Sequence, residues 1–180
     1  MSPNRSDLRK GRDDDLGAKP GAVVLDGGVA DISRSRTVAA QPQAIWDVLA
    51  DFGSLSSWAD NVDHSCISNN GPDGGPIGST RRVQRGRNAL LERITEFDPP
   101  SALAYDITGL PPRLCEVTNR WTLRPVTEGS DATVVTLTST VQIGAGPLAR
   151  LAERIVGRAM AKQSDAMLAG LAHRLENAHA

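Results

Sequence analysis

The sequence predicts a single α+β domain in which a curved, seven-stranded antiparallel sheet wraps around one long C-terminal helix. Seven short segments rich in β-branched residues are separated by turn signals. A helical pattern without an internal proline fills Pro147–Asn177 at the end of the chain. Within the strands, apolar side chains alternate with polar ones, so only one face of the sheet must be covered.

The length, charge and cysteine count limit the classes of protein to consider. A chain of 180 residues with a net charge of −1 fits one domain and lacks the basic excess of proteins that bind nucleic acid. No apolar run approaches the ~20 residues that cross a membrane, and the first residues lack the apolar core of a secretory signal. Two cysteines, Cys66 and Cys115, imply no disulfide framework. We therefore expect a cytoplasmic protein with no nucleic acid partner and no integral membrane association.

The first part of the chain differs in composition from the rest. Residues 1–28 mix charges of both signs with glycine and proline and carry few apolar side chains. Such a segment buries too little surface to offset the entropy lost on ordering. We expect 1–28 to be a disordered tail and 29–180 to form the folded domain.

Two short helices are expected after the first strand, Ala30–Val38. The first helix is Pro42–Ala50, where proline suits the opening turn because its missing N–H has no partner there. The second helix or turn is Ser54–Trp58. Six further strands then follow, with the glycine-rich loop Asn69–Gly78 after the first of them. These strands are His64–Ser68, Thr80–Arg85, Asn88–Phe97, Ala102–Thr108, Leu114–Val126 and Ala132–Ile143.

Turn signals set the expected register of the strands. Gly86 marks a two-residue hairpin between Arg85 and Asn88, and two longer turns join later strands. The turns pair Arg81 with Glu92, Ile94 with Tyr105, Phe97 with Ala102, and Trp121 with Val135. Because side chains alternate along a strand, these pairings divide the sheet into two faces. The mostly apolar face comprises Arg81, Val83, Leu90, Glu92, Ile94, Leu103, Tyr105, Ile107, Cys115, Val117, Asn119, Trp121, Leu123, Val135, Leu137, Ser139 and Val141.

The long helix is the only expected element large enough to cover that apolar face. Its apolar or small side chains recur at helical spacing. They are Leu148, Leu151, Ile155, Ala159, Ala166, Gly170 and Leu171. Small or polar residues in its middle, Ala159, Gln163 and Ala166, predict unfilled volume between helix and sheet. In the alternative, a large sheet side chain such as Trp121 or Tyr105 fills that volume.

Three stretches of sequence resemble a known family. They are SRTVAAQPQAIWDVLADFGSLSSWADNV within residues 33–62, LLERITEFDPPSALAYDI at 90–107, and NRWTLRPVTEGSDATVVTLTSTV at 119–141. With the long helix, they are similar to the polyketide cyclase/dehydrase branch of the START-like superfamily, whose members share the helix-grip fold of the birch-pollen allergens. The resemblance implies an internal hydrophobic cavity that holds a lipid, sterol or polyketide. It also implies, in aromatase/cyclase members, a polar residue inside the cavity, and Arg81 is the position that we match to it.

Arg81, Glu92 and Tyr105 are the candidate catalytic residues. A charge pair on the apolar face is seldom present for stability alone, because burial of two charges is unfavourable unless they are well hydrogen-bonded. Arg81 could hold a ligand carbonyl, enolate or carboxylate while Glu92 or Tyr105 moves a proton. In the alternative, Arg81 and Glu92 form a cross-strand pair bathed in water near the mouth of the cavity.

The candidate ligand-binding residues line the same expected cavity. Polar groups there would orient a ligand by hydrogen bonds, although each could equally be a satisfied core residue. Trp58 could stand at the entrance or pack in the core. The candidates are Trp58, Val83, Leu90, Ile94, Ile107, Val117, Asn119, Trp121, Leu137, Ser139, Ala159 and Gln163.

The remaining sequence features predict no metal site and no cofactor. His64 and Cys66 share a strand face, but a zinc site needs three or four ligands. A basic stripe on the long helix reads as a solvated face, or as a docking site for an acidic carrier protein or an anionic membrane. That stripe is Arg150, Arg154, Arg158 and Lys162. A homodimer also stays open.

We therefore expect a protein that binds a small hydrophobic or amphipathic molecule, such as a polyketide or a lipid, between sheet and helix. One hypothesis is a cyclase or dehydratase-like enzyme. A second is a non-catalytic carrier or sensor that uses the same pocket, and a third is an interaction module that works through the basic stripe.

Overall fold

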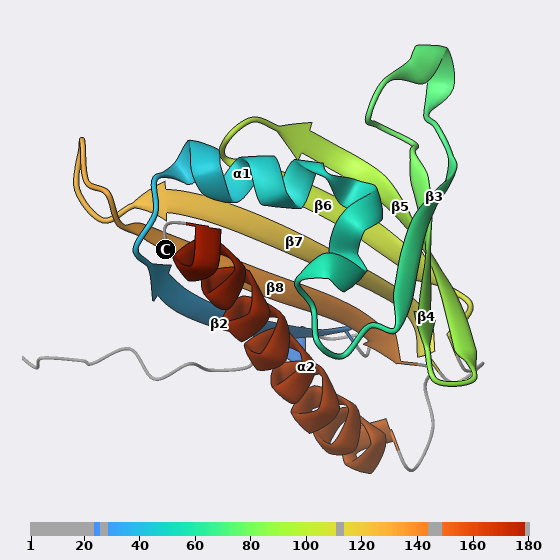
Figure 1. The fold of residues 1–180 in the computed structure, drawn as a ribbon. Helices are drawn as coiled ribbons and strands as arrows, with labels where there is room; N and C mark the ends of the chain where they lie inside the picture. Colours follow the sequence, from blue (N-terminus) through green and yellow to red (C-terminus); the bar gives the residue numbers. More distant parts are fainter. Residues whose placement is uncertain (1–23, 26–28, 111–113, 144–148, 179–180) are drawn as a thin grey trace, which may run out of the picture.

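Eight strands form one antiparallel sheet, and both α-helices lie on the same side of it (Figure 1). The computed structural model describes residues 24–25, 29–110, 114–143 and 149–178. The strand order is β1-β2-β8-β7-β6-β5-β4-β3. The strands are β1 (Val24–Leu25), β2 (Val29–Val38), β3 (His64–Asn69), β4 (Thr80–Arg85), β5 (Asn88–Asp98), β6 (Ala102–Thr108), β7 (Leu114–Pro125) and β8 (Thr133–Ile143). The helices are α1 (Pro42–Ala50) and α2 (Ala149–Ala178), with 3₁₀ turns η1 (Phe52–Ser57) and η2 (Pro72–Gly74).

The expected α+β helix-grip architecture is confirmed, with one strand more than predicted. Val24 and Leu25 pair with Ala30 and Val29, so this part of 1–28 extends the sheet and is not a disordered tail. Residues 1–23 lie outside the described residues.

The predicted register holds at the centre of the sheet and is wrong in two places. Arg81 faces Glu92, and Ile94 faces Tyr105. The predicted partner of Phe97 is wrong, because a β-bulge between Ile94 and Glu96 adds one residue to β5 and pairs Phe97 with Leu103.

The predicted partner of Trp121 is also wrong, because Trp121 pairs with Leu137 and not with Val135. The β7–β8 connection is longer than expected, and its last ladder pair joins Pro125 to Thr133. The resulting shift is an even number of residues, so it leaves every side chain on its predicted face.

Both faces of the sheet therefore have the predicted character. Val83, Tyr105, Val117, Trp121 and Leu137 are all at most 2% exposed. On the opposite face the side chains of Glu116, Arg120 and Arg124 are exposed. The side chain of Cys115 lies outside the described part.

The buried face of α2 differs from the predicted stripe. Ile155 is 61% exposed, and Ala159 and Ala166 are also exposed, whereas Gly170 and Leu171 are buried as expected. Small residues occur on every side of this helix, so apolar periodicity alone does not select the face that packs. The side chains of Leu148 and Leu151 are outside the described residues. The described buried face consists of Ala161, Ser164, Met167, Leu168, Gly170, Leu171, Ala172 and Leu175.

Candidate functional site

A buried ion pair stands on the inner face of the sheet. Arg81 of β4 is 3% exposed and Glu92 of β5 is 5% exposed. The guanidinium donates from Nε to Oε2 of Glu92 at 2.6 Å, and its Nη2 lies 2.5 Å from the same oxygen. Its Nη1 donates to the backbone oxygen of Phe52 at 2.8 Å. The pair is thus enclosed by protein, and the alternative of a pair bathed in water is wrong.

Two aromatic rings hold the guanidinium in place. The Cζ atom of Arg81 lies 3.9 Å from the ring centre of Phe52 and 4.9 Å from that of Tyr105. The two rings meet edge to face at 5.6 Å. Cations are attracted to the faces of such rings, more strongly where water is excluded. Sequence analysis did not single out Phe52, because its role depends on how η1 folds back over β4.

Tyr105 is the centre of a buried hydrogen-bond network. Asn119 donates from Nδ2 to the phenol oxygen at 3.3 Å, and Trp121 donates from Nε1 at 3.5 Å. Ser139 donates in turn to Oδ1 of Asn119 at 2.6 Å. All four residues are at most 3% exposed. These predicted interior groups are therefore brought together, from β6, β7 and β8.

The electrostatics keep Tyr105 protonated. Burial raises the pKa of its phenol, and the negative charge of Glu92 raises it further, while Arg81 and the two hydrogen bonds act in the opposite direction. A neutral phenol is both a donor and an acceptor. Among the described residues, Tyr105 Oη accepts two hydrogen bonds and no acceptor is placed for its own hydrogen.

Glu92 also keeps one unused oxygen. Both contacts from Arg81 fall on Oε2, and within the described chain no hydrogen bond reaches Oε1. The site therefore offers the Tyr105 hydroxyl and the remaining N–H groups of Arg81 as donors, and Oε1 of Glu92 as an acceptor. Together these groups can bind a hydroxyl or carbonyl, or act as a general acid and a general base.

The predicted apolar walls surround this polar group closely. Val83, Ile94, Val117, Trp121 and Leu137 are between 0% and 2% exposed. Ile107 is 9% exposed, and Leu90 is half-buried against the core. The rings of Phe52 and Tyr105 lie beside the ion pair, and the ring of Trp121 is buried next to Tyr105.

Two predicted ligand contacts on α2 lie elsewhere. Ala159 is exposed, so its expected place inside the trough is wrong; the face that packs is rotated away from it. Gln163 is half-buried and accepts a hydrogen bond from Nδ2 of Asn61 at 2.8 Å. This hydrogen bond joins α2 to the connection before β3. The Oδ1 atom of Asn61 is buried and has no hydrogen-bond partner among the described residues.

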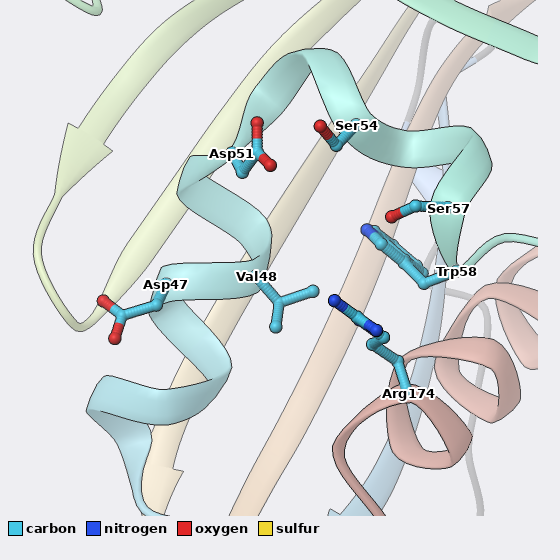
Figure 2. A pocket seen from close by; sticks show the side chains of 7 residues that line it. All are labelled: Asp47, Val48, Asp51, Ser54, Ser57, Trp58 and Arg174. Atoms are coloured by element: carbon cyan, nitrogen blue, oxygen red, sulfur yellow. The ribbon is translucent and has the colours of Figure 1, made fainter. Parts of the chain in front are cut away.

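Trp58 stands between the interior and a surface pocket. Its ring meets that of Trp121 edge to face at 6.2 Å, and the residue is 7% exposed. On its other side, a pocket of about 180 Å³ opens between α1, η1 and α2 (Figure 2). Figure 2 shows the guanidinium of Arg174 beside Trp58 at this pocket. The pocket is lined by Asp47, Val48, Asp51, Ser54, Ser57, Trp58 and Arg174.

The other sequence candidates lie on the surface. His64 and Cys66 are exposed, and in the described part of the chain no three His, Cys, Asp or Glu side chains gather as metal ligands would. Arg154, Arg158 and Lys162 are exposed along α2, whereas the side chain of Arg150 is outside the described residues. None of the described helices combines the length and apolar character needed to cross a membrane.

Comparison with known families decides the classification. The family model described as polyketide cyclase / dehydrase and lipid transport matches residues 29–176. The chain belongs to this family. A comparison with curated protein sequences finds no match.

Solved structures confirm the fold of this family member. The Zhui aromatase/cyclase of Streptomyces sp. R1128 aligns with a TM-score of 0.68 and 19% identity over 82% of this chain and 94% of that one. A START superfamily protein of Mycobacterium smegmatis aligns with a TM-score of 0.64 and 15% identity over 82% and 97%. The protein Ara h 8.0201 aligns with a TM-score of 0.67 and 16% identity over 83% and 99%.

Proposed function

We propose that this family member binds a small hydrophobic or amphipathic molecule between the sheet and α2, with the polar end of the ligand at Arg81, Glu92 and Tyr105. The observation that carries the proposal is the buried ion pair. Replacing a buried ion pair by apolar residues is often neutral or stabilising. The presence of such a pair in an apolar interior therefore points to a role beyond stability.

The surroundings of the pair suit the apolar body of such a ligand. Aliphatic and aromatic side chains from β4 to β8 lie on the side of the sheet where α1, η1 and α2 pack, and the few polar groups among them converge near Tyr105. Binding sites for small molecules have this composition: mostly apolar walls with a small number of placed hydrogen-bonding groups. Because the described side chains of this face are buried, we expect a side chain at its edge to move when a ligand enters.

Trp58 is the side chain that we propose to move. It separates the surface pocket of Figure 2 from Trp121, and it belongs to the short segment after η1 rather than to the sheet. Segments at the ends of short helical turns reorient more easily than strands paired on both sides. Rotation of this indole would join the pocket to the interior.

Catalysis on the bound molecule is the second candidate function. Tyr105 can donate a proton to a ligand carbonyl while Oε1 of Glu92 accepts one, which is the division of labour that cyclisation and dehydration require. Similarity to the Zhui aromatase/cyclase supports this candidate. A carrier or sensor would use the same pocket without turnover. For an enzyme, the exposed stripe Arg154, Arg158 and Lys162 would suit an acidic carrier protein that delivers a tethered substrate in the cytoplasm.

Mass spectrometry of the native protein, purified without detergent, tests the binding proposal. We expect a mass above that of the polypeptide, lost on extraction with organic solvent, and a thermal shift of about 5 °C or more when the extracted molecule is added back. Arg81→Met is expected to abolish the shift. The matched control Arg120→Gln, on the outer face, is expected to keep it.

The binding proposal fails on one clear result. It fails if no small molecule is retained and if fatty alcohols, fatty acids, sterols and aromatic polyketides all leave the melting temperature unchanged.

A further inference from the structure

We infer that the polar group of the ligand is an uncharged hydroxyl or carbonyl and not a carboxylate. This inference rests on the function proposed above and specifies the chemical class of the ligand. It follows from the way in which the charge of Arg81 is already used.

The guanidinium of Arg81 has its protein partners in place. Nε and Nη2 both contact Oε2 of Glu92, and Nη1 donates to the backbone oxygen of Phe52. Its Cζ atom also lies 3.9 Å from the ring centre of Phe52 and 4.9 Å from that of Tyr105. A ligand carboxylate would have to displace Glu92 to form a bidentate contact with the edge made by Nε and Nη2.

The buried site is electrically neutral as it stands. Among the described residues, Arg81 and Glu92 are the charged side chains in the buried interior, and their charges cancel. Tyr105 adds no charge, since burial and Glu92 keep its phenol protonated. A ligand carboxylate would introduce a negative charge without a counter-charge, beside the carboxylate of Glu92. Burial of an unpaired charge is strongly unfavourable.

A neutral polar group can bind to the donors and acceptors of the site that have no partner among the described residues. The hydroxyl of Tyr105 can donate to a carbonyl or hydroxyl oxygen, and Oε1 of Glu92 can accept from a hydroxyl. A ligand hydroxyl satisfies both, and a ligand carbonyl satisfies the first. Neither group disturbs the pairing of Arg81.

Chain-matched probes test the inference on the full-length protein. Dodecanol and dodecanoic acid have the same number of carbons and differ in charge at about pH 8, well above the ordinary carboxyl pKa of ~4.3. After extraction of any copurified molecule, isothermal titration should show that the alcohol binds at least about tenfold more tightly than the acid, a difference of ~1.4 kcal/mol.

A variant without the Glu92 charge tests whether that charge is the reason why a carboxylate is excluded. In Glu92→Gln the charge of Arg81 is no longer cancelled, so we expect the affinity for dodecanoic acid to rise about tenfold or more and the preference to reverse. The control Glu96→Gln removes a carboxylate that pairs with Arg120 on the other face, and it should retain the preference for the alcohol.

The titrations test the inference about ligand charge separately from the binding proposal. Equal affinities, or tighter binding of the acid by the native protein, would overturn the inference and leave the binding proposal intact. Failure of both probes to bind would overturn the inference, and it would refute the binding proposal as well if no copurified molecule, sterol or aromatic polyketide bound either. Should Glu92→Gln not fold, the native comparison decides alone.

Discussion

Replacing Gly170 by alanine is expected to destabilise the protein by about 1–3 kcal/mol, the usual range for overpacking. Alanine is normally the better helix former, so propensity alone predicts the opposite sign. Gly170 lies on the buried side of α2, where an added Cβ would stand 2.2 Å from the backbone oxygen of Trp58. Backbone cannot rotate away as a side chain can, so α2 must separate from the segment after η1.

Gly157→Ala is the matched control on the same helix. Apart from its chain neighbours and the adjacent backbone of α2, no described atom lies within 4 Å of its added Cβ, so this substitution should stabilise the protein by about 0.5–1 kcal/mol. Urea unfolding of the two variants gives both differences. A Gly170→Ala variant as stable as Gly157→Ala would show that α2 does not approach Trp58 as described.

Arg81→Met is expected to lower the free energy of unfolding by about 3–5 kcal/mol, because it leaves the carboxylate of Glu92 buried without its partner. Methionine is similar in length to the aliphatic part of arginine, so loss of packing contributes less than loss of charge. The control Arg120→Met breaks the exposed pair with Glu96 and should cost under ~1 kcal/mol.

The double variant Arg81→Met with Glu92→Met separates stability from function. With both charges removed, no unpaired charge remains, and we expect most of the lost stability to return. Chemical unfolding measures all three variants. A single variant with native stability would mean that water reaches the pair, and the argument for a functional ion pair would then fail.

Much of the fold could be predicted because it depends on local signals. The turn at Gly86 fixes the β4–β5 register, and alternation along the strands then places Arg81 and Glu92 on the inner face. The bulge in β5 could not be foreseen, because Thr95 carries no turn signal of its own. It changed the partner of Phe97 and left the site unchanged.

The site could be predicted in part, and the limits have physical causes. Tyr105, Asn119 and Ser139 follow from strand parity, which survives register errors of two residues. Phe52 and Trp58 owe their roles to η1, whose path over the sheet depends on tertiary packing. Ala159 was misplaced because an alanine-rich helix presents no single apolar face.

The indole N–H signals of the protein report most directly whether a ligand enters the space between sheet and helix. The chain has three tryptophans, each of which gives one indole signal in a two-dimensional NMR spectrum and can be assigned by substitution with phenylalanine. Trp121 donates to Tyr105 at the proposed binding site, whereas Trp46 of α1 packs edge to face against Phe97 near the end of β5. On saturation with dodecanol, the signal of Trp121 should shift and that of Trp46 should stay. A shift confined to Trp58, with Trp121 unchanged, would place the ligand in the surface pocket and contradict binding inside the sheet.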